Sequence, residues 1–146
     1  MRVQDVMTRR VETVSEGESA SDARERMRRR RIRHLVVLRD HKIVGVVSSR
    51  DLDSVDFSRG ASLVEEVMAS PAVSVSPDAT LRQAANLLRG RTIGCLPVME
   101  EDRLVGIVTT TDLLELIGRG VERPVARTKR WVMKDRGQRP RRPSGR

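Results

Sequence analysis

Two short stretches of the chain place a hydroxyl three residues before a carboxylate. The first pair is Ser48 and Asp51, in the stretch GVVSSRD, and the second is Thr109 and Asp112, in GIVTTTD. A carboxylate can accept both hydroxyls of a ribose, and the N–H groups at a helix start suit a phosphate. The same spacing also serves a helix cap, with Ser or Thr at the N-cap and an acidic residue in the first turn. Both interpretations stay open at this point.

Each stretch begins with a glycine inside a predicted strand, Gly45 in the first and Gly106 in the second. Glycine weakens a strand, so its presence there indicates close approach of another backbone or of a ligand. We therefore include both glycines among the candidate binding residues. We also expect Gly106→Val to give a folded protein that no longer binds its ligand.

The two stretches belong to an internal repeat with an offset of 61 residues. VQDVM at residues 3–7 aligns with VEEVM at residues 64–68, and one ungapped register continues to Leu52 and Leu113. A register of this length indicates a duplication.

Each copy predicts the element order β-α-β-β-α. A short strand ends near Val14 or Val75, and an amphipathic helix follows, which Thr80 opens with a capping box in the second copy. Two apolar strands joined by a short polar turn come next, and a last helix starts near Ser49 or Thr110. The fold class is therefore α+β. Because about 55 residues bury little surface alone, we expect the two halves to pack through their sheets.

We place the first repeat at residues 1–56, the second at 57–118 and a basic tail at 119–146. The whole net charge of +9 lies in the tail, since the acidic and basic residues before it cancel. The tail, with Trp131 among scattered cations, is predicted to be disordered. Binding of nucleic acid or of a protein partner through this tail is the alternative function that we retain.

The remaining sequence features argue against several classes of function. The single cysteine, Cys95, and the two histidines have no metal-ligand spacing, so we predict no disulfide and no metal site. No motif arranges a nucleophile with a base, so we predict no catalytic residue and no enzyme. The chain has neither an apolar run of about 18 residues nor a signal peptide, so we predict no membrane span and a cytoplasmic location.

The combined motifs resemble the cystathionine-β-synthase (CBS) domain family. The motifs are VxDVM, then xVS with a capped helix, then LPVM followed by LVGIVT-x-x-D. Together they cover roughly residues 2–117. They occur as a tandem pair, an arrangement called a Bateman module. The resemblance implies two repeats about a pseudo-twofold axis with two clefts between them. It also implies a regulatory role without a required cofactor, with AMP, ADP, ATP or another adenosyl compound as ligand. A homodimer and a regulated protein partner are implied as well.

The resemblance further implies which residues bind the nucleotide in each cleft. One cleft joins a pair from the first copy to residues of the second: Ser48, Asp51, Ala72, Val73, Leu96 and Pro97. The other joins a pair from the second copy to residues of the first: Thr109, Asp112, Val11, Glu12, Arg33, His34 and Leu35.

The two copies depart from the family pattern at different places. The LPV of the family is kept at residues 96–98 but is LVV at residues 35–37. Arg33 and His34 resemble the basic pair that some family members direct at phosphates. We therefore expect the Asp112 cleft to take a phosphate-rich ligand, with Arg33 as the phosphate partner because its guanidinium stays charged.

Overall fold

The computed structural model describes residues 1–120 of the 146-residue chain. Residues 1–113 form one compact unit, and a second unit begins at Leu114. The predictions for the basic tail, including Trp131, concern residues that lie outside the described part, apart from residues 119 and 120.

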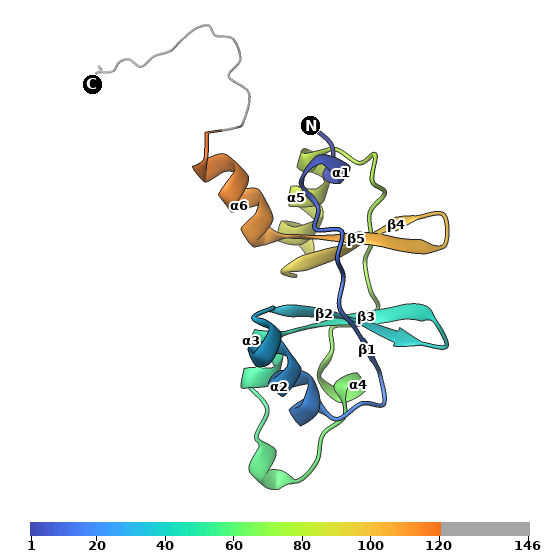
Figure 1. Ribbon diagram of the computed structural model, residues 1–146, viewed down its shortest axis with the longest axis vertical. Coiled ribbons are helices and arrows are strands. Elements are labelled where there is room, and N and C mark those ends of the chain that lie inside the picture. Colours follow the sequence, from blue (N-terminus) through green and yellow to red (C-terminus); the bar gives the residue numbers. More distant parts are fainter. Residues whose placement is uncertain (121–146) are drawn as a thin grey trace, which may run out of the picture. The chain divides into compact units, whose positions relative to one another are not determined.

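The helices and strands follow the repeat (Figure 1). The first copy contains α1 (Val3–Val6), β1 (Thr13–Ser15), α2 (Ala20–Arg30), β2 (His34–Arg39), β3 (Lys42–Ser48) and α3 (Ser49–Asp53). A short 3₁₀ helix, η1 (Phe57–Arg59), leads into the second copy. That copy contains α4 (Val64–Val67), α5 (Leu81–Arg91), β4 (Cys95–Glu100), β5 (Arg103–Thr109) and α6 (Thr110–Gly118).

The predicted first strand of the second copy is reduced to a single bridge. In the first copy, β1 pairs in parallel with β2 over three residues, and the Val36 N–H donates to the carbonyl of Glu12 at 3.1 Å. In the second copy only Val75 bridges to Val98. Pro97 stands where the first copy has Val36 and has no N–H to donate, so the corresponding ladder is shortened.

The two long helices end alike, and α5 begins with the predicted capping box. Thr80 Oγ1 accepts from the Gln83 N–H at 3.0 Å, and Gln83 Oε1 accepts from the Thr80 N–H at 2.8 Å, which confirms the predicted capping box of α5. Both helices end at a residue in the left-handed conformation, Arg31 at φ 56° and Thr92 at φ 54°. The matching ends turn the chain into β2 and β4 in the same way.

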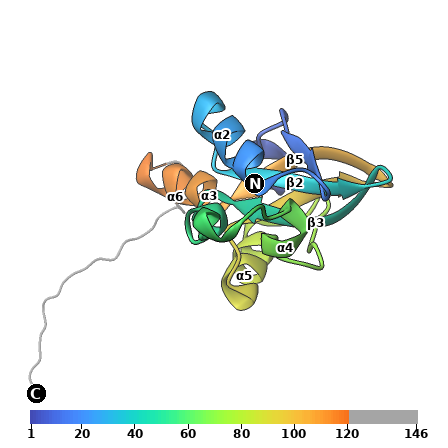
Figure 2. The same ribbon diagram turned by 90° about the horizontal axis from the view of Figure 1, so that it is seen from below.

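The two hairpins have the same register. Val37 opposes Gly45 in the first and Val98 opposes Gly106 in the second, and an irregularity follows each pair. The sheets lie face to face between the helices of each half (Figures 1 and 2). Their contact is a buried cluster of Val36, Val46, Cys95 and Ile107. The predicted packing through the sheets is confirmed.

The first segment of each repeat crosses to the other half. Val3 is buried in the core of the second repeat, where its N–H donates to the Ala79 carbonyl at 2.8 Å. Val64 is buried in the core of the first repeat, where its N–H donates to the Glu18 carbonyl at 2.9 Å. The exchange follows pseudo-twofold symmetry and leaves neither core complete without the other repeat.

The crossing segments also pair with the hairpins. Thr8 forms a bridge with Ile107, and Ala69 forms the corresponding bridge with Val46. Each of these pairs exchanges two backbone hydrogen bonds of 2.8–3.1 Å.

Candidate functional site

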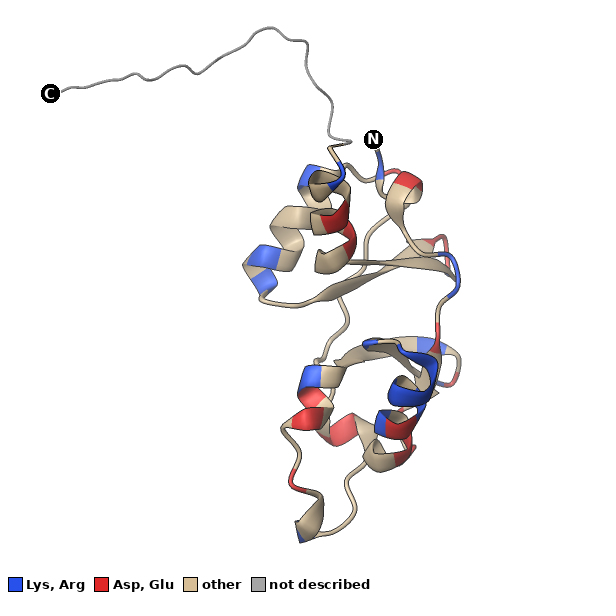
Figure 3. Ribbon diagram, turned by 60° about the vertical axis from the view of Figure 1, so that its left-hand side comes forward, with Lys and Arg blue, Asp and Glu red and all other residues tan. Residues whose placement is uncertain are grey.

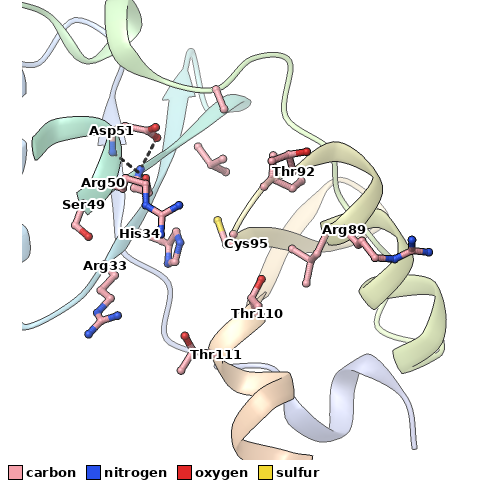
Figure 4. A pocket seen from close by; sticks show the side chains of 16 residues that line it. Arg33, His34, Ser49, Arg50, Asp51, Arg89, Thr92, Cys95, Thr110 and Thr111 are labelled. Carbon is pink, nitrogen blue, oxygen red and sulfur yellow. Dashed lines mark hydrogen bonds between the residues drawn. The ribbon is translucent and has the colours of Figure 1, made fainter. Parts of the chain in front are cut away.

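A cavity of about 560 Å³ lies between the two repeats. The polar and charged residues that the first repeat contributes are Arg33, His34, Ser48, Ser49, Arg50 and Asp51. The second repeat contributes Arg89, Thr92, Gly94, Cys95, Thr110 and Thr111. Figure 4 shows the two groups of side chains on opposite sides of the cavity. Apolar side chains, among them Val46, Ala69 and Ile93, complete the lining.

The hydroxyl–carboxylate pairs form helix caps. Ser48 Oγ accepts from the Asp51 N–H at 3.0 Å, and Asp51 Oδ2 accepts from the Ser48 N–H at 2.9 Å. Thr109 and Asp112 repeat these two hydrogen bonds at 3.0 and 2.9 Å. The cap interpretation is therefore confirmed. Within residues 1–120, no hydrogen bond reaches Oδ1 of either aspartate, so each carboxylate keeps one oxygen for a further donor.

Fewer backbone N–H groups are free to bind a phosphate at the start of α3 than the sequence suggests. The Ser49 N–H donates to the Arg33 carbonyl at 2.8 Å, in addition to the two N–H groups that the cap uses. Three backbone donors at this helix start are thus paired inside the protein. Positive charge in the cavity comes instead from arginine side chains.

His34 lies half-buried in the cavity wall. Its Nε2 atom is 3.0 Å from the position that a Cβ on Gly94 would take, so the ring packs closely against the second repeat. Burial lowers the pKa of His34, while Asp51 and Asp112 raise it in part and Arg33 lowers it further. In the first sheet, His34 directly opposes Ser48, the N-cap of α3. At neutral pH the ring is uncharged and can accept or donate a hydrogen bond.

Cys95 occupies the position in the second repeat that His34 occupies in the first. Burial, with a smaller contribution from Asp51, raises the pKa of its thiol to about 12. The side chain is 1% exposed, so it stays a protonated, buried group.

The cavity combines the predicted residues differently from the family-based assignment. Arg33 and His34 line it together with Ser48 and Asp51, whereas the resemblance grouped them with Asp112. The reason is the register of the first sheet, in which His34 directly opposes Ser48. The start of β2 and the end of β3 are therefore neighbours.

Several predicted residues do not line this cavity. Leu35, Leu96 and Pro97 are fully buried, so their side chains belong to the packed interior. The Glu12 carboxylate accepts two hydrogen bonds from Arg30, at 3.0 and 3.1 Å. The others lie outside the lining as well: Val11, Ala72, Val73, Thr109 and Asp112.

The two glycines have a packing role. A Cβ on Gly106 would lie 2.6 Å from Sδ of Met7 and 3.0 Å from the Thr8 carbonyl oxygen. A Cβ on Gly45 would lie 2.7 Å from the Ala69 carbonyl oxygen. The crossing segments lie directly against both glycines, so close approach of another part of the backbone, one of the two predicted reasons, accounts for them. Gly106→Val is accordingly expected to damage packing first.

Sequence patterns missed the part of the lining that the second repeat supplies. Arg89 and Thr92 stand at the end of α5, and Thr110 and Thr111 open α6. The signal that could have found them is their position directly before and after the paired strands.

The described residues contain no group of three or more His, Cys, Asp or Glu side chains that could hold a metal ion. Within residues 1–120, every helix is too short or too polar to cross a membrane.

Comparison with known families agrees with this architecture. The CBS domain matches the chain twice, over residues 3–56 and 64–119. This chain belongs to the CBS domain family, as a tandem pair.

Relatives and solved structures extend the comparison. Homoserine O-acetyltransferase of Methanohalobium evestigatum is 35% identical over 117 residues, which is 79% of this chain and 24% of that enzyme. The chain thus spans about a quarter of the first curated relatives it matches.

The solved structures that this chain resembles include complexes with adenosyl compounds. The CBS domain pair of protein MJ0100, in complex with 5′-methylthioadenosine and S-adenosyl-L-methionine, is 25% identical with a TM-score of 0.75, and the match covers 82% of this chain and 98% of that one. CBSX2 in complex with AMP is 29% identical with a TM-score of 0.69, over 84% of this chain and 98% of that one.

Proposed function

We propose that this chain is a non-catalytic regulatory module that binds an adenine nucleotide or a related adenosyl ligand between its two repeats. The observation that carries the proposal is the cavity of about 560 Å³ that contains Asp51, with Oδ1 of that carboxylate not used by the helix cap. Its volume lies within the roughly 300–1,000 Å³ typical of small-molecule sites. The adenosyl compounds bound to MJ0100 and CBSX2 support this choice of ligand.

The lining suggests a role for each part of the ligand. Asp51 would accept the ribose hydroxyls, and Val46 and Ile93 would pack against the base. Arg33 and Arg50 would supply positive charge to a phosphate. This proposal replaces the expectation that the Asp112 cleft takes the phosphate-rich ligand, because Arg33 lines the cavity of Asp51.

Regulation would follow from the contact of one ligand with both repeats. A ligand that fits one arrangement of the two walls better than another shifts the population toward it. The exchanged segments at Val3 and Val64 would transmit that shift to both cores, because each core contains a helix of the other repeat. A homodimer, a regulated protein partner and a cytoplasmic location belong to the same proposal.

Calorimetric titration with AMP, ADP, ATP, S-adenosylmethionine and 5′-methylthioadenosine tests this function. Asp51→Asn keeps an oxygen for the cap but removes the charge, so we expect it to weaken binding of the preferred ligand by about tenfold or more. Asp112→Asn is the matched control, since it caps α6 with the same two hydrogen bonds. Equal losses from the two variants, or no binding of any adenosyl compound, would contradict the proposal.

A further inference from the structure

Helix α6 exposes two large apolar side chains. Leu114 and Ile117 are 63% and 58% exposed, and their spacing of three residues puts them on one side of the helix. Glu115, which follows Leu114, is exposed as well. At the positions of the two apolar side chains, the first repeat has the exposed aspartates Asp53 and Asp56. The exposed apolar pair is therefore a feature that the second repeat has and the first lacks.

A second cavity, of about 420 Å³, lies against helix α2. Its apolar lining comes from Met27 and Ile32. Its basic lining comes from four arginines of α2 and of the residues that follow it: Arg24, Arg28, Arg31 and Arg33. Figure 3 shows how the basic residues gather along α2. The cavity thus combines an apolar surface with strong positive charge.

Most of the basic side chains around this cavity have no acidic partner. Arg24 forms an ion pair with an aspartate of α3 at 3.5 Å, whereas Arg28 and Arg31 form none within residues 1–120. Two other arginines of the same helix, Arg26 and Arg30, are paired with glutamates. The positive charge that stays unpaired on α2 is thus concentrated at the cavity.

The two repeats carry opposite net charges. Residues 1–56 contain 13 Lys and Arg against 10 Asp and Glu, and residues 57–118 contain 5 against 8. When two copies of the chain meet, each repeat is therefore repelled by the same repeat of the other copy and attracted by the different one. This charge pattern favours a head-to-tail pairing of two copies.

We infer that two copies of this chain pair head to tail, with the exposed side of α6 in one copy packed on the cavity of α2 in the other. Leu114 and Ile117 then contact the apolar lining of that cavity. Glu115 lies among arginines that have no partner in their own chain, Arg28 and Arg31. Under twofold symmetry this contact forms twice in the dimer. The inference makes the homodimer of the proposed function specific and rests on that part of it alone.

Pairing of like surfaces would satisfy these side chains less well. Contact between the α6 helices of two copies would cover Leu114 and Ile117, but it would bring Glu115 close to its own counterpart. It would also leave the arginines of both cavities unpaired. Contact between two α2 helices would set arginines against arginines. The head-to-tail arrangement removes both repulsions and covers the apolar side chains.

Sedimentation velocity of the full-length chain over a range of concentrations tests the inference. We expect a dimer, and Ile117→Gln should raise its dissociation constant at least about tenfold through lost apolar burial. Glu115→Arg and Arg28→Glu should each do the same, because each sets like charges against one another twice in the dimer. The double variant Glu115→Arg/Arg28→Glu exchanges the two charges, so it should recover most of the wild-type affinity.

Arg29→Glu is the matched control. Arg29 is exposed in the last turn of α2, as Arg28 is, but does not line the cavity, so this variant should dimerise as the wild type does. All four substituted side chains are exposed, and circular dichroism should show an unchanged fold for every variant.

Three results would overturn the inference. The first is a monomeric wild type, the outcome expected if residues 121–146 cover α6 instead. The second is a dimer that neither Glu115→Arg nor Arg28→Glu weakens, as pairing of like surfaces predicts. The third is a double variant no better than the single ones. Binding of an adenosyl compound by a monomeric chain would leave the proposed ligand standing, whereas a head-to-tail dimer that binds none would contradict the proposed ligand alone.

Discussion

The wall formed by the end of α2 and the start of β2 carries arginines and a histidine, whereas the corresponding wall at α5 and β4 is neutral apart from Arg89. The residues that build the two cores, the crossings and the caps are nevertheless matched between the repeats, as Gly45 and Gly106 illustrate. The duplication thus preserves the architecture while the cavity walls diverge. Within the cavity between the repeats, a ligand would meet Arg33 and Arg50 on the first-repeat side and Arg89 on the second-repeat side.

The largest expected effect tests whether the exchange of segments is symmetric. Val3→Ala and Val64→Ala each remove a side chain that is 0% exposed in the core of the opposite repeat. We expect each to lower the free energy of unfolding by about 2–3 kcal/mol, from lost burial and the cavity left behind. Urea unfolding followed by circular dichroism measures both. A loss below about 0.5 kcal/mol for only one variant would mean that its crossing helix contributes little to that core.

The two glycines should differ slightly, although their environments are related by the repeat. An alanine at 45 meets a backbone carbonyl at 2.7 Å, while an alanine at 106 meets the Met7 side chain at 2.6 Å, which can move more readily. We expect unfolding free energy to fall by about 2 kcal/mol for Gly45→Ala and about 1 kcal/mol for Gly106→Ala.

Gly90→Ala is the control for these variants, because nothing lies within 4 Å of the added Cβ and the residue is inside α5. It should stabilise the protein by about 0.5–1 kcal/mol. A stabilising effect of Gly45→Ala as well would show that the crossing segment does not press against β3.

The N-caps of α3 and α6 test the equivalence of the two copies through a smaller change in stability. Ser48→Ala and Thr109→Ala remove matched hydrogen bonds of 3.0 Å, so each should cost about 1 kcal/mol of stability. Thermal unfolding of the two variants checks this. Stability that falls for one variant and not for the other would show that the two helix starts are not equivalent.

The smallest expected effect is a pH dependence of stability that comes from His34 and not from Cys95. Burial lowers the pKa of His34 in the folded protein, so the unfolded chain binds its proton more readily. Stability should therefore be complete above the unfolded pKa of about 6.5 and decline as the pH falls below it. His34→Gln should flatten the unfolding free energy between about pH 7.5 and 5.5, a range in which the Cys95 thiol, with a pKa raised to about 12, does not titrate. An unchanged slope would mean that other groups dominate.

Most of the fold could be predicted from the sequence, because the repeat supplies each element twice. The hairpins, the two long helices and the packing of the sheets follow from apolar periodicity and capping residues. The crossing of α1 and α4 could not, since Val3 and Val64 look like ordinary apolar positions until both halves are folded. The parallel pairing at Val75 is reduced to one bridge because Pro97 has no N–H to donate. The sequence alone does not show this, since it does not say which strand Pro97 lies beside.

The site was predictable only in part. Ser48 and Asp51 stand out through their repetition, and Arg33 and His34 through their charge in an apolar context. Their grouping depends on the sheet register, which sets His34 opposite Ser48. The contribution of Arg89 and Thr92 depends on the packing of one repeat against the other, which no local pattern contains.

A crystal structure of the chain grown with ATP tests the central claim most directly. The account predicts adenosine in the cavity between the repeats, with its ribose hydroxyls within hydrogen-bond distance of Oδ1 of Asp51 and its phosphates beside Arg33. A ribose held by Asp112, with no nucleotide at Asp51, would contradict it.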